Sequence, residues 1–244
     1  MIHNGRRKLS YDAEAALAHL SAADRKLATL IERAGPFTLR LGHTGTPFTS
    51  LLESIIYQQL HGKAAATIHQ RVRALYGDDD PAPDLLLATP DDRLRGAGLS
   101  GNKLAAIRDL AAKTLDGTVP SQRAIQRMSN DEIIARLTEV RGIGPWTVEM
   151  LLIFRLGRPD VFPVTDYGVR KGFALTFQRL SPAKTVSAAD LPTPEQMHRR
   201  ARRWSPYRSV ASWYLWRACD LAKDQAKPAP DPSSAPARRR STRA

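Results

Sequence analysis

The chain has 244 residues, 42% of them hydrophobic, so it can form one large domain or two small ones. Its 37 Lys and Arg residues outnumber its 24 Asp and Glu residues, and the net charge of +13 favours a polyanionic partner, most often nucleic acid. The single cysteine, Cys219, excludes an internal disulfide, a cysteine-rich zinc site and an iron–sulfur cluster, and it fits a reducing compartment. We expect no membrane span and no secretory signal, because no sufficiently long apolar segment occurs.

Helical spacing of apolar residues dominates the first half of the chain. It predicts one or two helices over 11–34, with Ser21 as an N-cap, and a further helix that opens at Ser50. Helical composition continues to Gly77. Shorter helical segments are then predicted around 84–88 and 91–95, followed by a helix that ends near Leu115.

The second half also has a helical pattern. Ser129 and Glu132 have the spacing of a capping box before a short helix, and Pro145 suits the first turn of another that ends near Leu156. Helices near 194–203 and 207–223 complete the body, and the fold class is predicted to be all-α. Residues 226–244 are rich in Pro, Ser, Ala and Arg, which predicts a disordered basic tail.

The segment VRGIGPWTVEM, residues 140–150, has the composition of a helix-hairpin-helix turn. Gly142 and Gly144 permit backbone angles closed to other residues and leave their amides exposed. Together with the N-terminus of the next helix, these N–H groups suit a phosphate oxygen, and such contacts hold DNA without reading its sequence. The alternative is a tight turn between helices whose glycines serve geometry alone.

Asp166 follows this hairpin by about twenty residues and lies where the next helix begins. A carboxylate in that position is an ordinary N-cap. The helix dipole would also keep it ionised, as a reaction that develops positive charge on a sugar requires. One helix and a connector could bring it back beside a nucleotide that the hairpin holds.

Four segments together resemble one family of DNA repair enzymes. The segment from Leu137 to Phe173 resembles the helix-hairpin-helix–Gly/Pro–Asp signature of the base-excision DNA glycosylases. IIYQQLHGKAAATIHQRV, LRGAGLSGNKLAAIRDLA and RWSPYRSVASWYLWR resemble the 3-methyladenine DNA glycosylase II branch of that superfamily. The resemblance spans roughly residues 15–220 and preserves the order of the segments.

The resemblance implies a two-lobed helical domain over residues 10–225, with an active-site cleft between the lobes. One lobe would comprise approximately 10–60 and 175–225, and the other approximately 61–174. Asp166 would be the catalytic carboxylate. The DNA-backbone contacts would come from the hairpin residues Arg141, Gly142, Ile143, Gly144 and Thr147.

Two departures narrow the choice within the superfamily. Members that cut the DNA strand form a Schiff base with a lysine just after the hairpin, but Trp146 stands there, and no lysine occurs between Lys113 and Lys171. The iron–sulfur loop of other branches is also absent. The chain starts almost at once with the helical body, so it resembles the compact form without an N-terminal β-rich domain.

Removing a base from a duplex requires rotating the nucleotide out of the stack. The family places its wedge after the helix at 50–60, so the candidates are Gln59, Leu60 and His61, although Leu60 could equally be a core residue. Aromatic faces would attract a cationic alkylated purine. The candidates for this base pocket are Trp146, Trp204, Tyr57, Tyr167, Tyr207 and Trp213.

The predicted activity is monofunctional hydrolysis of alkylated purines, of the 3-methyladenine and 7-methylguanine type, to leave an abasic site. Two alternatives stay open: a monofunctional glycosylase for uracil or other deaminated or mismatched bases, and a non-catalytic helix-hairpin-helix DNA-binding module. We expect a monomer that binds double-stranded DNA in the cytoplasm or nucleoid, or in the nucleus of a eukaryote. No metal or organic cofactor is required, and a monovalent cation at the hairpin turn is a further expectation from the resemblance.

Overall fold

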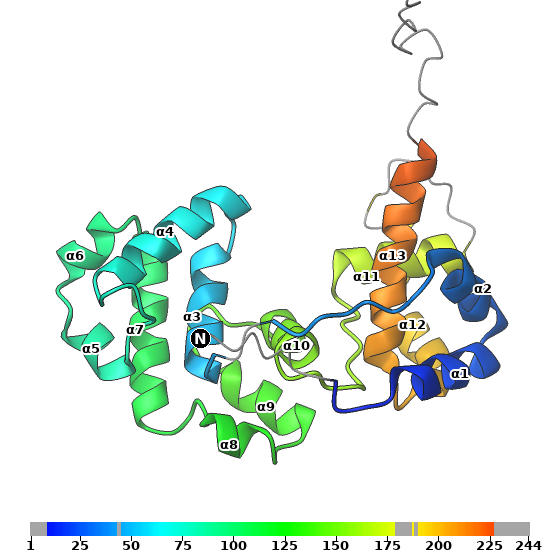
Figure 1. Cartoon of the computed structure of the whole chain (residues 1–244), viewed down its shortest axis with the longest axis horizontal. Coiled ribbons are helices and arrows are strands. Elements are labelled where there is room, and N and C mark those ends of the chain that lie inside the picture. The colour runs from blue at the N-terminus through cyan, green and yellow to red at the C-terminus, as the bar shows by residue number, and fades with distance from the viewer. Residues whose placement is uncertain (1–8, 43–44, 179–186, 188–189, 227–244) are drawn as a thin grey trace, which may run out of the picture.

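A computed structural model describes residues 9–42, 45–178, 187 and 190–226, and Figure 1 shows the arrangement of its helices. These residues form helices and connecting segments without a β-strand, so the prediction of an all-α fold is confirmed. No helix in this part of the chain is long and apolar enough to span a membrane. The predicted disordered tail, 226–244, lies outside the described residues except for Ala226, which ends the last helix.

The helices form two groups, each around its own hydrophobic core, and the first core runs from Phe48 to Val161. Its helices are α3 (Pro47–Tyr57), α4 (Gly62–Ala74), α5 (Pro83–Ala88), α6 (Asp91–Gly96), α7 (Gly101–Leu115), α8 (Gln122–Ile125), α9 (Asn130–Leu137) and α10 (Pro145–Phe154). The second group contains α1 (Ala13–Ala23), α2 (Arg25–Ala34), α11 (Tyr167–Phe177), α12 (Pro194–Ala201), a 3-10 turn (Arg202–Trp204) and α13 (Arg208–Ala226). In Figure 1 the groups lie on opposite sides of the molecule, with α10 between them.

The predicted lobe boundaries are therefore corrected at both crossings. The helix α3 was expected in the lobe of residues 10–60, but its buried side chains belong to the core that ends at Val161. The helix α11 was expected in the lobe of residues 61–174, but it packs against α13 in the other core. The physical reason is burial: α3 buries its apolar face mainly against α7 and α4, and α11 buries its face against α13.

Local sequence signals predicted some helix ends correctly and others wrongly. The capping box of Ser129 and Glu132 is present at the start of α9. The predicted N-cap at Ser21 is wrong, because α1 continues to Ala23 and Asp24 caps α2 instead. Helix α3 likewise opens earlier than Ser50, with Thr46 as its N-cap, because Pro47 suits the first helical position.

Asp24 is a buried polar residue of the second core and joins three parts of it. Its carboxylate accepts two hydrogen bonds from the guanidinium of Arg200, both of 2.7 Å, and one of 3.2 Å from the indole of Trp204. Burial raises the pKa of Asp24, but the bonds and charge of Arg200, with the Trp204 N–H, outweigh it and hold the pKa below its ordinary value.

We expect Asp24→Ala to lower the free energy of unfolding by about 3 kcal/mol, because it removes a helix cap and leaves the Arg200 guanidinium and Trp204 N–H without their acceptor. Denaturant unfolding would measure the loss. The matched control is Asp12→Ala, which removes the exposed cap of α1 and should cost about 1 kcal/mol. Equal losses in the two variants would contradict a special role for the buried carboxylate.

Candidate active site

Asp166 lies where the two helical groups meet, and N–H groups from three helices hold its carboxylate. The indole of Trp146 on α10 donates to Oδ2 at 2.8 Å. The indole of Trp216 on α13 donates to Oδ1 at 2.8 Å, and the backbone N–H of Val169 on α11 donates to Oδ1 at 2.8 Å. These donors stabilise a negative charge at a fixed place between the lobes.

Two glycines of α11 allow this arrangement. A Cβ on Gly168 would lie 2.7 Å from Cδ1 of Trp216 and 3.2 Å from Oδ1 of Asp166, so a side chain here would push the indole off the carboxylate. A Cβ on Gly172 would lie 1.9 Å from the carbonyl oxygen of Leu215, so only glycine lets α11 approach α13 this closely. The N-cap position of Asp166 and the absence of these two side chains together place the carboxylate.

Glu149 is a second carboxyl group near Asp166, and the sequence analysis did not identify it. It lies on α10 one turn after Trp146, on the same face of the helix. Burial, and then the negative charge of Asp166, raises the pKa of Glu149 to about 7. Its Oε2 is buried without a hydrogen-bond partner among the described residues. The site therefore contains two carboxyl groups in different environments.

One of the two hairpin glycines has the predicted geometry. Gly142 has φ +79°, in the left-handed region that favours glycine. The prediction for Gly144 is wrong, because its φ of -100° and ψ of 170° are extended backbone that other residues also adopt, and Pro145 begins α10 directly after it. Arg141, Gly142 and Gly144 are exposed, but the side chains of Ile143 and Thr147 are buried. Of these last two residues, only the backbone can meet a phosphate from the hairpin face.

Neighbouring segments brace the hairpin. The backbone N–H of Arg141 donates to Asp109 at 2.7 Å, and the side-chain amide of Gln58 donates to the carbonyl of Gly142 at 2.9 Å. A carbonyl oxygen has two lone pairs, so that of Gly142 has one left for a cation. A monovalent cation at the turn stays a prediction. In the described parts of the chain, no three His, Cys, Asp or Glu side chains gather as a metal site.

The wedge candidates occupy the short loop between α3 and α4, which Gln58 ties to the hairpin. Gln59 has φ +57°, rare outside glycine, and Leu60 is 39% exposed. Leu60 is therefore not a core residue, which was the alternative reading of its role. His61 is exposed at the N-cap of α4.

Of the six aromatic residues predicted to line the base pocket, two lie at Asp166. Trp146 is 47% exposed and Tyr167, the next residue after Asp166, is 56% exposed. Trp204 is wrong as a pocket residue: it is fully buried in the second core and bonded to Asp24. The other three pack against rings within the lobes, and no hydrogen bond in the described residues joins them to Asp166: Tyr57 against His69, Tyr207 against Tyr11 and His19, and Trp213 against Phe37 and Tyr214.

Sequence reasoning missed Trp216. It belongs to the quoted segment RWSPYRSVASWYLWR, from which Trp204, Tyr207 and Trp213 were named as candidates and Trp216 was not. A helical count along α13 places Trp216 three residues after Trp213, which does not reveal which of the two faces Asp166. The ring of Trp216 also packs 5.4 Å from that of Phe154 on α10, so it contacts both lobes.

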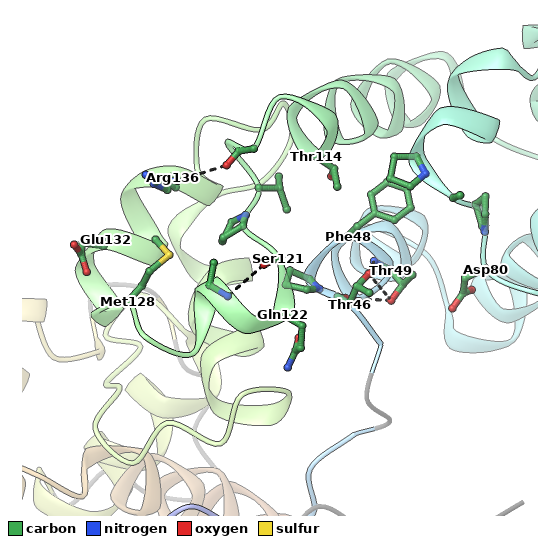
Figure 2. A pocket seen from close by; sticks show the side chains of 18 residues that line it. Thr46, Phe48, Thr49, Asp80, Thr114, Ser121, Gln122, Met128, Glu132 and Arg136 are labelled. Carbon is green, nitrogen blue, oxygen red and sulfur yellow. Dashed lines mark hydrogen bonds between the residues drawn. The ribbon is translucent and has the colours of Figure 1, made fainter.

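A cavity of about 920 Å³ lies in the first lobe, away from Asp166. Figure 2 shows Phe48 and Thr49 of α3 on one side of it, and Gln122 and Met128 near α8 on another. Asp166, Trp146 and Trp216 are not among the residues that line it. Size alone does not make it the reaction site, because it lacks the group of charged and aromatic side chains found at Asp166.

We expect Gly172→Ala to lower the free energy of unfolding by about 3 kcal/mol, because the new Cβ meets backbone on α13 that cannot move alone. Thermal unfolding would measure it. Gly101→Ala is the matched control, since Gly101 is also helical and a Cβ there meets nothing within 4 Å. If both variants keep the parental melting temperature, the close contact of α11 with α13 is not required.

The chain is similar to known proteins over most of its length. Residues 52–206 match the HhH-GPD superfamily of base excision DNA repair proteins. DNA-3-methyladenine glycosylase 1 of Schizosaccharomyces pombe is 34% identical over 212 residues, which cover 86% of this chain and 89% of the relative.

Two solved structures are similar throughout most of the chain. The S. pombe 3-methyladenine DNA glycosylase in complex with abasic DNA has a TM-score of 0.70 at 32% identity, over 83% of this chain and 95% of that one. The DNA-3-methyladenine glycosidase of Bacillus halodurans has a TM-score of 0.77 at 30% identity, over 89% of this chain and 94% of that one. The chain therefore belongs to the HhH-GPD superfamily of base excision DNA repair proteins, in its 3-methyladenine DNA glycosylase branch.

Proposed function

We propose that the protein is a monofunctional DNA glycosylase that hydrolyses alkylated purines, of the 3-methyladenine and 7-methylguanine type, from duplex DNA and leaves an abasic site. The observation that carries the proposal is the Asp166 carboxylate, fixed by two indole N–H groups where the lobes meet. The names of the similar proteins, and the abasic DNA bound to one of them, support the same reaction.

The aromatic groups around Asp166 suit a cationic base. N-alkylation gives the purine ring a positive charge, and the faces of indole and phenol rings attract such a charge. Trp146 and Tyr167 are exposed beside the carboxylate, and Trp216 adds a third ring from the other lobe. We therefore assign the base pocket to Trp146, Trp216 and Tyr167.

The reaction follows from the charge of the substrate. The bond between C1′ and the base nitrogen breaks, and its electron pair neutralises the cationic ring, so no strong general acid is needed. Positive charge then develops on the sugar, where the fixed carboxylate of Asp166 stabilises it electrostatically. Water completes the substitution at C1′ and gives the abasic product.

Trp146 also argues against strand cleavage. It occupies the position of the Schiff-base lysine, and its indole N–H is bonded to Asp166. An indole has no lone pair that can attack C1′, so the nucleophile is water and the DNA strand stays intact.

DNA binding is assigned to the braced hairpin and the loop before α4. The exposed residues Arg141, Gly142 and Gly144 suit two neighbouring phosphates through their backbone N–H groups and the arginine guanidinium. The positive net charge adds attraction independent of sequence. In this arrangement Leu60 is the wedge that fills the gap left by the flipped nucleotide. The protein acts as a monomer in the compartment that holds the DNA, without an organic cofactor.

We expect Asp166→Asn to slow base release by more than about 10²-fold, because the variant loses the negative charge that stabilises the sugar cation. Single-turnover release of 7-methylguanine from a defined duplex would measure the rate. Binding to an abasic duplex, followed by fluorescence anisotropy, should be kept because the hairpin is unchanged. Release at the parental rate would contradict the role of Asp166.

The same assay separates the alternatives. Duplexes that carry uracil or hypoxanthine in place of the methylated purine test the second substrate class. Faster release of uracil than of 7-methylguanine would contradict the proposed specificity. DNA binding without release of any base would show a non-catalytic helix-hairpin-helix module instead.

We expect Leu60→Ala to reduce release from duplex DNA by about tenfold while release from a single strand changes little, since only duplex DNA leaves a gap in a base stack to be filled. Paired single-turnover measurements on the two substrates would show this. Leu115→Ala is the matched control, because Leu115 is an exposed leucine at the end of α7. Equal losses on both substrates would argue against a wedge.

A further inference from the structure

The proposed hydrolysis leaves one question of chemistry: which group takes the proton of the attacking water. Both oxygens of Asp166 already accept hydrogen bonds, Oδ2 from Trp146 and Oδ1 from Trp216 and Val169. Three protein donors therefore occupy most of its lone-pair positions. A carboxylate held in this way has a fixed position for electrostatic stabilisation and little room to bind the attacking water as well.

Glu149 has the opposite environment. Its Oε2 is buried and accepts no hydrogen bond from the described part of the chain. A buried acceptor without a donor costs free energy, so a protein keeps one where it has a use. Glu149 shares a face of α10 with Trp146, whose indole contacts Asp166.

A cavity of about 370 Å³ meets Glu149 at the boundary between the lobes. Asn130 also lines it, and its Oδ1 is a second buried acceptor without a partner in the described residues. Both atoms expose almost no surface, so they lie behind the cavity wall, while the Glu149 side chain itself borders the open space. The cavity is large enough to hold water beside the Glu149 side chain.

Arg208 and Asp160, which also line this cavity, pair with each other. Nε of Arg208 lies 2.6 Å from Oδ1 of Asp160. Burial raises the pKa of Asp160, but hydrogen bonds from Arg208 and Ser205 outweigh burial and hold the pKa below its ordinary value. The Arg208 charge is thus largely matched by Asp160. The titratable and charged groups around Glu149 are Asp166 at the start of α11, Asp131 on α9, Asp160 in the connector, His198 on α12 and Arg208 on α13.

We propose that Glu149 is the general base of the reaction, which deprotonates the water that attacks C1′, while Asp166 remains the carboxylate that stabilises the sugar cation. This inference rests on the proposed function. In the step, the water oxygen forms a bond to C1′ and the bond from C1′ to the base breaks. The bonding pair leaves with the base, and the water proton moves to Glu149, which later releases it to solvent.

The environment of Glu149 suits this role. A general base works best when its pKa lies near the working pH, and burial with the charge of Asp166 brings the pKa of Glu149 to about 7. Below that pH Glu149 is protonated and cannot accept a proton. The rate of base release should therefore rise with pH towards about pH 7 and level off above it.

The test is single-turnover release of 7-methylguanine from duplex DNA by the parental protein and Glu149→Gln, from about pH 5 to about pH 9. Glu149→Gln should lower the plateau by on the order of 10²-fold and remove the rising limb. Glu149→Asp should restore the limb with a lower plateau, because it returns a carboxylate. Asp131→Asn is the matched control, a carboxyl on the same cavity that should leave rate and limb unchanged.

Stability measurements guard against loss of folding. Because the pKa of Glu149 is raised on folding, its contribution to stability is present below about pH 4.5 and lost as the pH rises through about 7. Glu149→Gln should therefore be at least as stable as the parent at about pH 8, and abasic-DNA binding should be kept.

Two results would overturn the assignment. An unchanged rate in Glu149→Gln would exclude Glu149 from the chemistry, and a lower rate with the limb intact would make it a structural residue. In both cases the parent still releases the base, so the proposed function stands. Failure of the parent to release any methylated purine would instead remove the proposed function and this inference together.

Discussion

The position of one carboxylate depends on the packing of both halves of the molecule. Asp166 is fixed only if α10, α11 and α13 bring their N–H groups to it together, and α10 belongs to one core while α11 and α13 belong to the other. Each hydrogen bond is short and directed, so a shift of either lobe would break at least one. The position of the Asp166 carboxylate therefore depends on the folding of both cores.

Glycine makes that coupling possible in α11. The missing side chain of Gly172 brings the helix against the backbone of α13, and the missing side chain of Gly168 lets the Trp216 indole reach past it to Asp166. Gly168 and Gly172 are four residues apart and so lie on one face of the helix. Glycine lowers the helix propensity of α11 at both positions. It also lets α11 approach α13 more closely than a larger residue would allow.

The sequence predicted those parts of the fold and site that depend on local signals. The capping box at Ser129, the start of α10 at Pro145 and the N-cap position of Asp166 follow from the residues of one turn, and all are present. The cores that cover α3 and α11 depend on contacts between distant segments, so the lobe boundaries were wrong.

The same distinction explains the aromatic residues. Trp204 and Trp216 stand in one motif, and nothing local shows that the first meets a buried Asp24 while the second meets Asp166. Glu149 was missed for a related reason. A glutamate in an apolar helix is read as a solvated charge, and only the packed structure shows a buried oxygen without a donor.

Helix α10 combines three of the site's requirements in its first two turns. Its N-terminus follows the hairpin, the Trp146 indole donates to Asp166, and Glu149 lies on the same face. In the reaction proposed above, Trp146 offers no amine, so water is the nucleophile and its proton needs an acceptor. The acceptor we assign, Glu149, lies one turn further along the same helix. The two residues that we assign to hydrolysis without strand cleavage are thus local neighbours, and any shift of α10 would move both.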